Sequence, residues 1–397
     1  MLELLMVKNI AILGSTGSIG RNALKVIDAL GIQYKITALS AHSSTELLAE
    51  QIRRYKPEFV AVTHPDYYKE FRDSVGNSDI KILAGPDGLV EIAQLDEVDI
   101  VLAAVVGSAG LPAILAAARS GKQLAIANKE PLVIAGQLLM KAAKENGSTI
   151  LPVDSEHSAV FQAMQSGSRD EVNKIILTAS GGPFRQATVE QIKNVSLEQT
   201  LSHPVWNMGP KITVDSATMM NKAFEVIEAH WLFDMPTEKI EVLIHPESIV
   251  HSLVEFVDGS VIAQLGEPDM CLPIQYALTY PKRVAGITKP LWLDKIGSLT
   301  FEMPNEQVFR SLALGFEVAQ TGGTAAVVFN AANEAAVEEF LAGRINYVSI
   351  MDLIEDCLGK HSVKTSLSLE DIFEADSWAR REVAGNIKRM TRSARAI

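Results

Sequence analysis

Apolar runs that alternate with helical segments dominate the first 150 residues of this chain. Three of the runs read NIAILG, VDIVLAAV and QLAIAN, and each is apolar at nearly every position. Strands of this kind are buried on both faces, which is typical of a parallel sheet covered by helices on both sides. The intervening stretches, such as SIGRNALKVIDAL, have the length and spacing of helices. Residues 1–150 therefore predict a doubly wound α/β domain of the Rossmann type.

The pattern changes after about residue 150. The runs NKIILTAS, KIEVLIH, SIVHSLVEFV and SVIAQL predict strands, and Asp258-Gly259 predicts a hairpin between the last two. A long helix is predicted over residues 217–233, and most of the sequence near the C-terminus has a helical pattern. We expect three further parts: a central α+β domain over 151–290, a linker over 291–310 and a C-terminal helical bundle over 311–397.

Charge and composition exclude several classes of function. The 397 residues carry a formal net charge of −12, whereas domains that bind nucleic acid usually carry a basic excess. The most apolar stretch, residues 100–118, is interrupted by Gly107, Gly110 and Pro112, so it predicts a strand, a loop and a helix and not a membrane span. Two cysteines form neither a disulfide framework nor a zinc site, which fits a reducing cytoplasm.

A glycine-rich loop, GSTGSIG at residues 14–20, follows the first strand and opens a helix. This is the context in which a pyrophosphate binds at a helix N-terminus. The first glycine is one residue away from its place in the usual G-x-G-x-x-G pattern, so the alternative is a strand–helix turn that needs glycine only for its geometry. The loop also contributes the hydroxyls of Ser15, Thr16 and Ser18 as donors. The second strand ends in residues 39–44, LSAHSS, which contain neither an acid for the ribose of NAD nor an Arg or Lys for the 2′-phosphate of NADP.

Two carboxylates follow the predicted strand that ends near residue 152. Asp154 and Glu156 are two positions apart, so they point the same way in an extended chain. Neighbouring carboxylates suit a hard divalent cation such as Mg²⁺ or Mn²⁺. The alternative is that Asp154 or Ser155 caps the helix that follows.

A polar stripe runs beside the apolar stripe of the predicted helix over residues 217–233. Asn221 and Glu225 lie on it, Lys222 flanks it, and Ser216 precedes the helix. Hydroxyl, amide and ammonium groups at a helix start form a good phosphate pocket, and Glu225 is placed one turn deeper as a third metal carboxylate. The alternative is a solvated helix face with an i,i+3 Lys–Glu pair.

Three more segments carry candidate ligand groups. The glycine-rich stretch 178–184 is either a second phosphate cradle or a plain loop. The stretch 201–210, LSHPVWNMGP, is either a lid that excludes water or a small hydrophobic cluster under a loop. Lys129, at the end of the strand QLAIAN, is either a substrate donor or a surface charge.

Seven motifs together resemble one known family. In order they are GSTGSIG, ANKE, LPVDSEHSA, ASGGPF, HPVWNMGPKITVDSATMMNKAFEVIEAHWLF, HPESIVHS and NAANE. This series is similar, over nearly the whole chain, to the 1-deoxy-D-xylulose 5-phosphate reductoisomerases. The resemblance implies an NADP-dependent oxidoreductase that uses NADPH and Mg²⁺ or Mn²⁺, and that is typically a homodimer. It implies rearrangement and reduction of the sugar phosphate 1-deoxy-D-xylulose 5-phosphate to 2-C-methyl-D-erythritol 4-phosphate, in the non-mevalonate route to isoprenoid precursors.

The resemblance also implies roles for individual residues. The cofactor contacts would be Thr16, Gly17, Ser18, Ile19, Asn128, Glu130 and Gly209. The metal ligands would be Asp154, Glu156 and Glu225. The substrate contacts would be Lys129, Ser155, Glu156, Ser180, His203, Trp206, Ser216, Asn221, Lys222 and Glu225. Within these sets the phosphate would be held by Ser180, Ser216, Asn221 and Lys222, and the catalytic residues would be Lys129, Glu156 and His203.

One segment departs from the family pattern. Where the family often has Gly-Lys-Asn or a similar basic or amide stretch near the 2′-phosphate, this chain has His42-Ser43-Ser44. Two other functions remain open at this point: a simple NADP-dependent dehydrogenase of a phosphorylated sugar, without rearrangement, and a nucleotide-binding sensor without catalysis.

Overall fold

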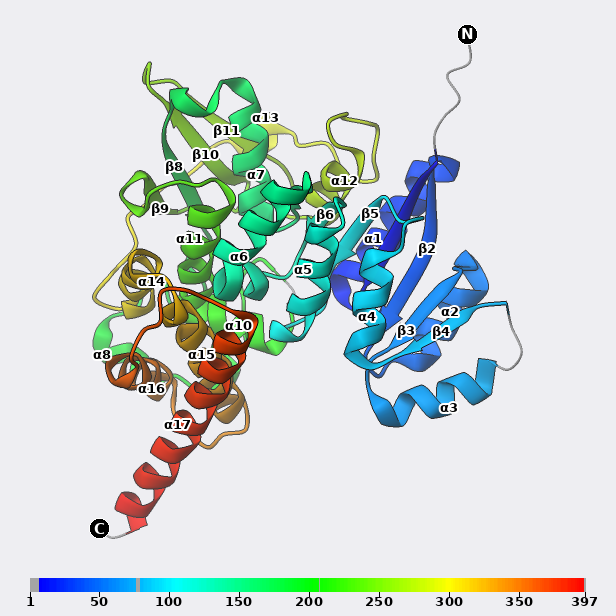
Figure 1. Ribbon diagram of the computed structural model, residues 1–397. Helices are drawn as coiled ribbons and strands as arrows, with labels where there is room; N and C mark the ends of the chain where they lie inside the picture. The colour runs from blue at the N-terminus through cyan, green and yellow to red at the C-terminus, as the bar shows by residue number, and fades with distance from the viewer. Residues whose placement is uncertain (1–6, 76–78, 207, 396–397) are drawn as a thin grey trace. The chain divides into compact units, whose positions relative to one another are not determined.

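The computed structural model describes residues 7–75, 79–206 and 208–395, with side chains up to residue 390. Asn207, in the middle of the predicted lid, lies outside the described residues. The chain divides into two compact units, which Figure 1 shows in ribbon form. The first unit contains residues 1–131, 137–162 and 269–291, and the second contains 132–136, 163–268 and 292–397. The predicted division into three domains at 150, 290 and 310 stays a prediction.

A seven-stranded parallel sheet forms the centre of the first unit. Its strands are β1 (Lys8–Leu13), β2 (Tyr34–Ala41), β3 (Phe59–Val62), β4 (Lys81–Ala84), β5 (Ile100–Ala103), β6 (Gln123–Ile126) and β7 (Thr149–Pro152). Their order is β4-β3-β2-β1-β5-β6-β7, so the direction of winding reverses between β1 and β5. In sheets of this kind ligands bind at the carboxyl ends of the strands around such a reversal. The structure confirms the predicted doubly wound α/β fold.

The helices of the first unit come from two distant parts of the chain. They are α1 (Ser18–Leu30), α2 (Thr45–Tyr55), α3 (Pro65–Val75), α4 (Gly85–Gln94), α5 (Leu111–Arg119), most of α6 (Glu130–Asn146), most of α7 (Ser155–Ala163) and α12 (Cys271–Thr279). Helix α12 packs against α1, and its Ile274 and Leu278 belong to the same buried cluster as Leu24 and Ile27. A segment more than 200 residues away in sequence thus completes this core.

This packing predicts a stability difference between two isoleucines of the first unit. Ile274 is fully buried, whereas Ile32 is 92% exposed. Replacing Ile274 with Ala is expected to cost about 2 to 5 kcal/mol in the free energy of unfolding, because it leaves a cavity under α12. The control, Ile32→Ala, is expected to cost less than about 0.5 kcal/mol. Urea unfolding of both variants measures the difference, and equal midpoints would show that α12 is not part of this core.

The second unit is built on a mixed four-stranded sheet. Its strands are β8 (Val172–Ala179), β9 (Ile240–Ile244), β10 (Val250–Phe256) and β11 (Val261–Leu265), in the order β11-β10-β8-β9. Strand β10 runs antiparallel to β8 and β11, and β8 runs parallel to β9. The predicted hairpin at Asp258-Gly259 is confirmed, with Gly259 at a φ of 86° that favours glycine.

Helices make up the rest of the second unit. They are α8 (Val189–Ile192), α9 (Leu197–Thr200), α10 (Pro210–Ala217), α11 (Met220–Leu232), α13 (Leu293–Ile296), α14 (Arg310–Thr321), α15 (Thr324–Leu341), α16 (Tyr347–Lys360) and α17 (Leu369–Arg395). The C-terminal region consists mainly of helices, as predicted. Within it, α15 packs against α16 and α17. Among the described residues, no helix has both the length and the apolar character that crossing a membrane requires.

The predicted helix over residues 217–233 is wrong at its start. Helix α10 ends at Ala217 and α11 begins at Met220. Between them Met219 adopts a φ of 59°, a left-handed conformation that interrupts the helical path. The turn at residues 218–219 therefore separates α10, which contains Ser216, from α11, whose first turn contains Asn221 and Lys222.

Candidate active site

The glycine loop after β1 has a geometry that only glycine satisfies at two positions. Gly14 has a φ of 86°, and a Cβ there would lie 2.6 Å from the carbonyl oxygen of Ala104, just past β5. A Cβ on Gly20 would lie 2.4 Å from the carbonyl oxygen of Gly14. Gly17 has no such restriction, since its nearest neighbour would be 3.5 Å away. The loop is therefore held tightly against the strand ends at the reversal point of the sheet.

Buried polar side chains fasten this loop to the end of β2. Ser40 Oγ accepts a hydrogen bond from Gly14 N at 2.9 Å, and the Ser40 carbonyl accepts one from Ser15 N at 2.9 Å. Ser15 Oγ donates to Gln51 Oε1 at 2.6 Å, and Gln51 Nε2 donates back to the Ser15 carbonyl at 3.0 Å. The prediction that Ser15 offers its hydroxyl to a ligand is wrong, because this hydroxyl is buried and bonded to Gln51.

The N-terminus of α1 is open to an anion. Gly17 is its N-cap residue and has no side chain to cap the helix, and the first turn contains no acidic residue. Gly17 and Ser18 are exposed, while Thr16 and Ile19 are half-buried. Free backbone N–H groups and the helix dipole favour a phosphate at such a position. This loop therefore combines two positions that only glycine can occupy with a helix N-terminus that is open to an anion.

The ends of β6 and β7 bring a lysine and an aspartate together. These strands are adjacent and parallel, so the residues that follow them meet at the same edge of the sheet. Lys129 Nζ lies 3.0 Å from Asp154 Oδ2, and the Lys129 side chain is 9% exposed. The interpretation of Lys129 as a surface charge is wrong, since burying an ammonium is costly unless it is paired.

Asn128, next to this pair, carries an unusual buried amide. It is 8% exposed, and neither its Nδ2 nor its Oδ1 has a hydrogen-bond partner among the described residues. An unsatisfied buried amide costs free energy, so it marks a position prepared for another group. Close by in sequence, Glu130 is also buried. Farther along, Ser155 Oγ donates to Glu156 Oε2 at 2.6 Å, so this hydroxyl orients the carboxylate instead of capping α7.

In the second unit, the glycine-rich loop after β8 presents Ser180. Gly181 and Gly182 have φ values of 81° and 64°, and a Cβ on Gly182 would lie 2.8 Å from the carbonyl oxygen of Ser216. These two glycines let the loop after β8 lie directly on the end of α10. Ser180 and Ser216, which are 36 positions apart in sequence, thereby come from touching segments.

His203 is held as a neutral donor beside Ser180. Its Nε2 lies 3.1 Å from Ser180 Oγ, and its Nδ1 accepts hydrogen bonds from Trp206 N at 2.8 Å and Val205 N at 3.2 Å. Because Nδ1 is an acceptor, Nε2 carries the proton. Partial burial lowers the pKa of His203, which also favours the neutral form. His203 and Trp206 are half-buried and Gly209 is exposed.

The first turn of α11 contains a buried charge cluster. Lys222 Nζ forms a close ion pair with Glu225 Oε2, and Asn221 Nδ2 donates to Glu225 Oε1 at 2.5 Å. The side chains of Lys222 and Glu225 are 3% and 0% exposed. The interpretation of this stripe as a solvated helix face is therefore wrong. Fully buried charges are rare without a structural or functional partner.

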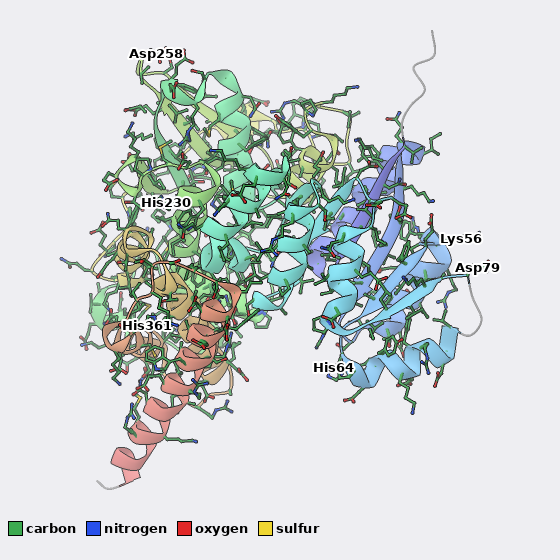
Figure 2. All side chains as sticks on the ribbon, viewed as in Figure 1. Lys56, His64, Asp79, His230, Asp258 and His361 are labelled. Atoms are coloured by element: carbon green, nitrogen blue, oxygen red, sulfur yellow. The ribbon has the colours of Figure 1, made fainter. Side chains whose placement is uncertain are left out.

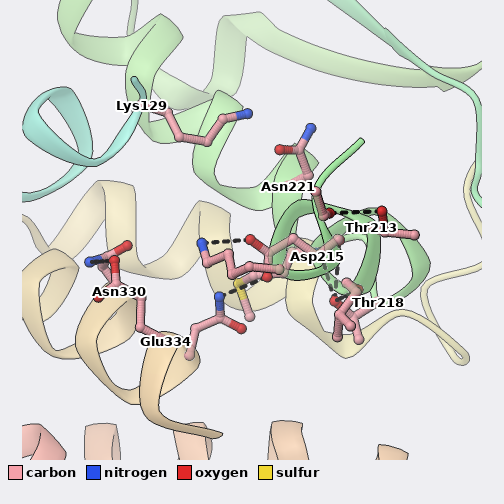
Figure 3. Close-up of polar contacts among 12 residues, drawn as sticks. Lys129, Thr213, Asp215, Thr218, Asn221, Asn330 and Glu334 are labelled. Atoms are coloured by element: carbon pink, nitrogen blue, oxygen red, sulfur yellow. Dashed lines mark hydrogen bonds and ion pairs between the residues drawn. The ribbon is translucent and has the colours of Figure 1, made fainter. Parts of the chain in front are cut away.

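The C-terminal helices support the turn between α10 and α11. Asp215 is 1% exposed, lies 2.6 Å from Lys211 Nζ and accepts a hydrogen bond at 2.9 Å from Asn333 Nδ2 of α15 (Figure 3). Ser311 Oγ donates to the Thr218 carbonyl at 2.5 Å, and the Tyr347 hydroxyl donates to the Ala217 carbonyl at 2.7 Å. The sequence interpretation missed these contacts; only the NAANE motif, which contains Asn333, pointed to this region.

Removing this support has a predictable cost. Asn333→Leu takes a donor away from the buried Asp215 carboxylate, which is expected to lower the free energy of unfolding by about 1 to 3 kcal/mol. Asn194 is exposed, so Asn194→Leu serves as the control and is expected to change the free energy of unfolding by less than about 0.5 kcal/mol. Thermal or urea unfolding compares the two, and an unchanged midpoint for Asn333→Leu would contradict the supporting role.

Family models match three successive segments of the chain. Residues 10–136 match the model for 1-deoxy-D-xylulose 5-phosphate reductoisomerase, and residues 150–233 and 265–382 match models for its C-terminal domains. A 1-deoxy-D-xylulose 5-phosphate reductoisomerase from Clostridium perfringens is 47% identical over 378 residues, which is 95% of this chain and 98% of the relative. The chain belongs to this family.

Solved reductoisomerases have the same fold. The enzyme from Zymomonas mobilis, in complex with NADPH, is 42% identical and superposes with a TM-score of 0.91 over 96% of this chain and 99% of its own. A reductoisomerase in complex with NADPH, fosmidomycin and magnesium is 42% identical and superposes with a TM-score of 0.92 over 97% and 99%. The reductoisomerase resemblance seen in the motifs is thereby confirmed over nearly the full chain.

Proposed function

We propose that this chain uses NADPH and a divalent metal to convert 1-deoxy-D-xylulose 5-phosphate into 2-C-methyl-D-erythritol 4-phosphate, in the non-mevalonate route to isoprenoid precursors. The observation that carries the proposal is the cluster that the half-buried Asn221 forms with the buried Lys222 and Glu225 at the start of α11. This cluster occurs in a chain whose β1 loop is open to an anion. Family membership and the ligands of the solved relatives support it.

The residues of the first unit fit a dinucleotide. Thr16, Ser18 and Ile19 offer backbone donors at the N-terminus of α1 for a pyrophosphate, and Gly17, whose N–H donates to the Gly14 carbonyl at 3.2 Å, leaves room for its approach. The unsatisfied amide of Asn128 is suited to a polar group of the cofactor, and Glu130 is a further proposed contact from this unit. Gly209, which belongs to the second unit, completes the proposed contact set. NADPH supplies the hydride, and the metal polarises substrate oxygens as a Lewis acid.

Three carboxylates fit a hard divalent cation. We assign Asp154, Glu156 and Glu225 as its ligands, because carboxylate oxygens are the ligands that Mg²⁺ and Mn²⁺ prefer. Burial of Glu225 and the hydroxyl that orients Glu156 both support this assignment. Glu225 forms an ion pair with Lys222, and Asp154 forms one with Lys129.

The remaining residues bind and orient the substrate. Ser180, Ser216, Asn221 and Lys222 are the proposed phosphate donors, because hydroxyl, amide and ammonium groups all suit a phosphate and Asn221 and Lys222 lie in the first turn of α11. Lys129 is assigned to a substrate oxygen, together with Ser155 and Glu156. The neutral His203 donates from Nε2, and Trp206 lies in the segment proposed to close over the substrate and exclude water.

The active form is a homodimer, as the resemblance implies. The enzyme works in the cytoplasm, which is supported by two free and buried cysteines: burial raises the pKa of Cys271 to about 11 and that of Cys357 to about 12. Such thiols are unreactive and form no disulfide.

One assay tests the proposal. Purified protein is incubated with 1-deoxy-D-xylulose 5-phosphate and either Mg²⁺ or Mn²⁺, with NADPH and NADH compared side by side. NADPH absorbance is expected to fall only when substrate and metal are both present, and a chelator is expected to stop the reaction. No loss of NADPH absorbance would overturn the proposal. Turnover without metal would contradict the carboxylate assignment and favour a simple dehydrogenase.

A further inference from the structure

Two histidines meet at the carboxyl ends of β2 and β3. These strands are adjacent and parallel, with Ala41 opposite Val62 in the register. His42 follows β2 and His64 follows β3, and their ring centroids lie 5.0 Å apart in an edge-to-face arrangement. Figure 2 labels His64 at the start of α3. Sequence reasoning singled out His42, but not its neighbour 22 residues further along the chain.

The histidine pair is linked to the glycine loop. Ser40, two residues before His42, accepts hydrogen bonds from the backbone of Gly14 and Ser15. In dinucleotide-binding domains the residue that follows the second strand lies beside the adenosine ribose, where an acid selects NAD and a cation accommodates NADP. A cofactor with its pyrophosphate at the N-terminus of α1 therefore presents its 2′-position to the end of β2.

Both imidazoles have one nitrogen bound by the protein and one available. His42 Nδ1 lies 2.8 Å from Thr63 Oγ1, and His64 Nδ1 accepts a hydrogen bond from Asp66 N at 3.3 Å. Within the described part of the chain, the Nε2 atoms of both rings have no hydrogen-bond partner. His42 is exposed and the His64 side chain is 33% exposed, so a ligand can reach both rings.

The surrounding groups leave the imidazoles as the main candidates for binding an anion. Asp66 Oδ2 lies 3.9 Å from His64 Nδ1, the Tyr67 ring packs edge-to-face on His64, and Glu46 is in the first turn of α2. Among the described residues, no Lys or Arg forms a hydrogen bond, ion pair or cation–π contact with either ring. Ser44, the N-cap residue of α2, makes no capping hydrogen bond with its side chain, so its hydroxyl is available as well.

We propose that His42 and His64 hold the 2′-phosphate of NADPH in place of a lysine or arginine, and that preference for 2′-phosphorylated nucleotides therefore grows as pH falls. The inference rests on the proposed function, because it assumes that the glycine loop binds NADPH. Histidine ordinarily changes its charge between about pH 5 and 8, whereas a lysine stays charged across that range. A neutral imidazole offers one N–H donor, while the protonated form adds a positive charge close to the phosphate.

Nucleotide binding measured by calorimetry tests this without turnover. The ligands are 2′,5′-ADP, which carries the 2′-phosphate, and 5′-AMP, which lacks it. For the unaltered protein, the ratio of the two Kd values is expected to favour 2′,5′-ADP about tenfold more strongly at about pH 6 than at about pH 8. The 2′-phosphate itself titrates near pH 6, so it contributes to the pH dependence of the unaltered protein. The contribution of the two histidines is therefore measured as the difference between the unaltered protein and its variants.

Three variants separate the outcomes. The double variant His42→Gln with His64→Gln is expected to lose most of the preference at about pH 6, and His42→Lys is expected to keep it at about pH 8. His230 lies in the second unit and is labelled in Figure 2; His230→Gln is the control and should behave like the unaltered protein. A double variant with unchanged preference would overturn this inference alone. Failure of the unaltered protein to bind either nucleotide or NADPH would overturn the proposed function with it.

Discussion

Glu225→Gln is expected to lower kcat/KM for 1-deoxy-D-xylulose 5-phosphate by about 10³-fold or more. Glu225 is fully buried, and its carboxylate is both the partner of Lys222 and a proposed metal ligand. An amide has nearly the same shape but no charge, so the metal loses an anionic ligand and the Lys222 ammonium loses its counter-charge. Removing a single preorganised electrostatic group commonly costs 10²- to about 10³-fold, and a metal ligand belongs at the upper end.

The measurement is steady-state NADPH oxidation across a range of Mg²⁺ or Mn²⁺ concentrations. The metal concentration needed for half-maximal rate is expected to rise in Glu225→Gln, which a purely structural role would not produce. Glu238→Gln is the control, because Glu238 is exposed in the same unit and is expected to leave the rate unchanged. If Glu225→Gln keeps its fold and its full activity, Glu225 is not a metal ligand.

Gly20→Ala is expected to weaken NADPH binding by about 100-fold. The added Cβ would lie 2.4 Å from the Gly14 carbonyl oxygen and 2.5 Å from Ser15 Cα. Both are backbone atoms of the loop that is fastened to Ser40, so either the loop or the start of α1 has to move. A displacement of about 1 Å at a positioned group is enough to cost about 10²-fold.

Fluorescence titration with NADPH measures this change. The control is Gly359→Ala in α16, where a Cβ would meet no atom within 4 Å and where helix propensity favours alanine. This control is expected to bind NADPH as the unaltered protein does. Equal NADPH affinity in Gly20→Ala would contradict the account of the glycine loop.

The first sheet could be predicted from the sequence for a simple physical reason. Strands buried on both faces need continuous apolar runs, and such runs are rare elsewhere in a soluble chain. The hairpin at Asp258-Gly259 was predictable for a similar reason, because its residues tolerate a conformation that others avoid. Local chemistry determines both features, so a local pattern reveals them.

The features that were missed depend on distant contacts. The packing of α12 on α1 joins segments far apart in sequence, and no periodicity within either helix encodes it. The break at Met219 could not be predicted, because no glycine or proline marks it in the sequence. Tertiary contacts accompany it instead: Ser311 and Tyr347 donate hydrogen bonds to the carbonyls of the two preceding residues. Whether the polar stripe of α11 is solvated or buried likewise depends on what covers it.

The site residues show the same division. The motifs identified Lys129, Asp154 and Glu225 as candidates, but for each of them the sequence left a purely structural alternative open. Burial removed that alternative for Lys129 and for the Lys222–Glu225 pair. His64 had no motif at all, because its significance comes from the pairing of β2 with β3.

The central claim is a rearrangement coupled to reduction, so the carbon skeleton of the product tests it most directly. The protein is incubated with ¹³C-labelled 1-deoxy-D-xylulose 5-phosphate, NADPH and Mg²⁺, and the product is analysed by NMR. We expect a branched product, 2-C-methyl-D-erythritol 4-phosphate, formed in a one-to-one ratio with the NADPH oxidised. An unbranched, reduced sugar phosphate would contradict it and identify a simple dehydrogenase instead.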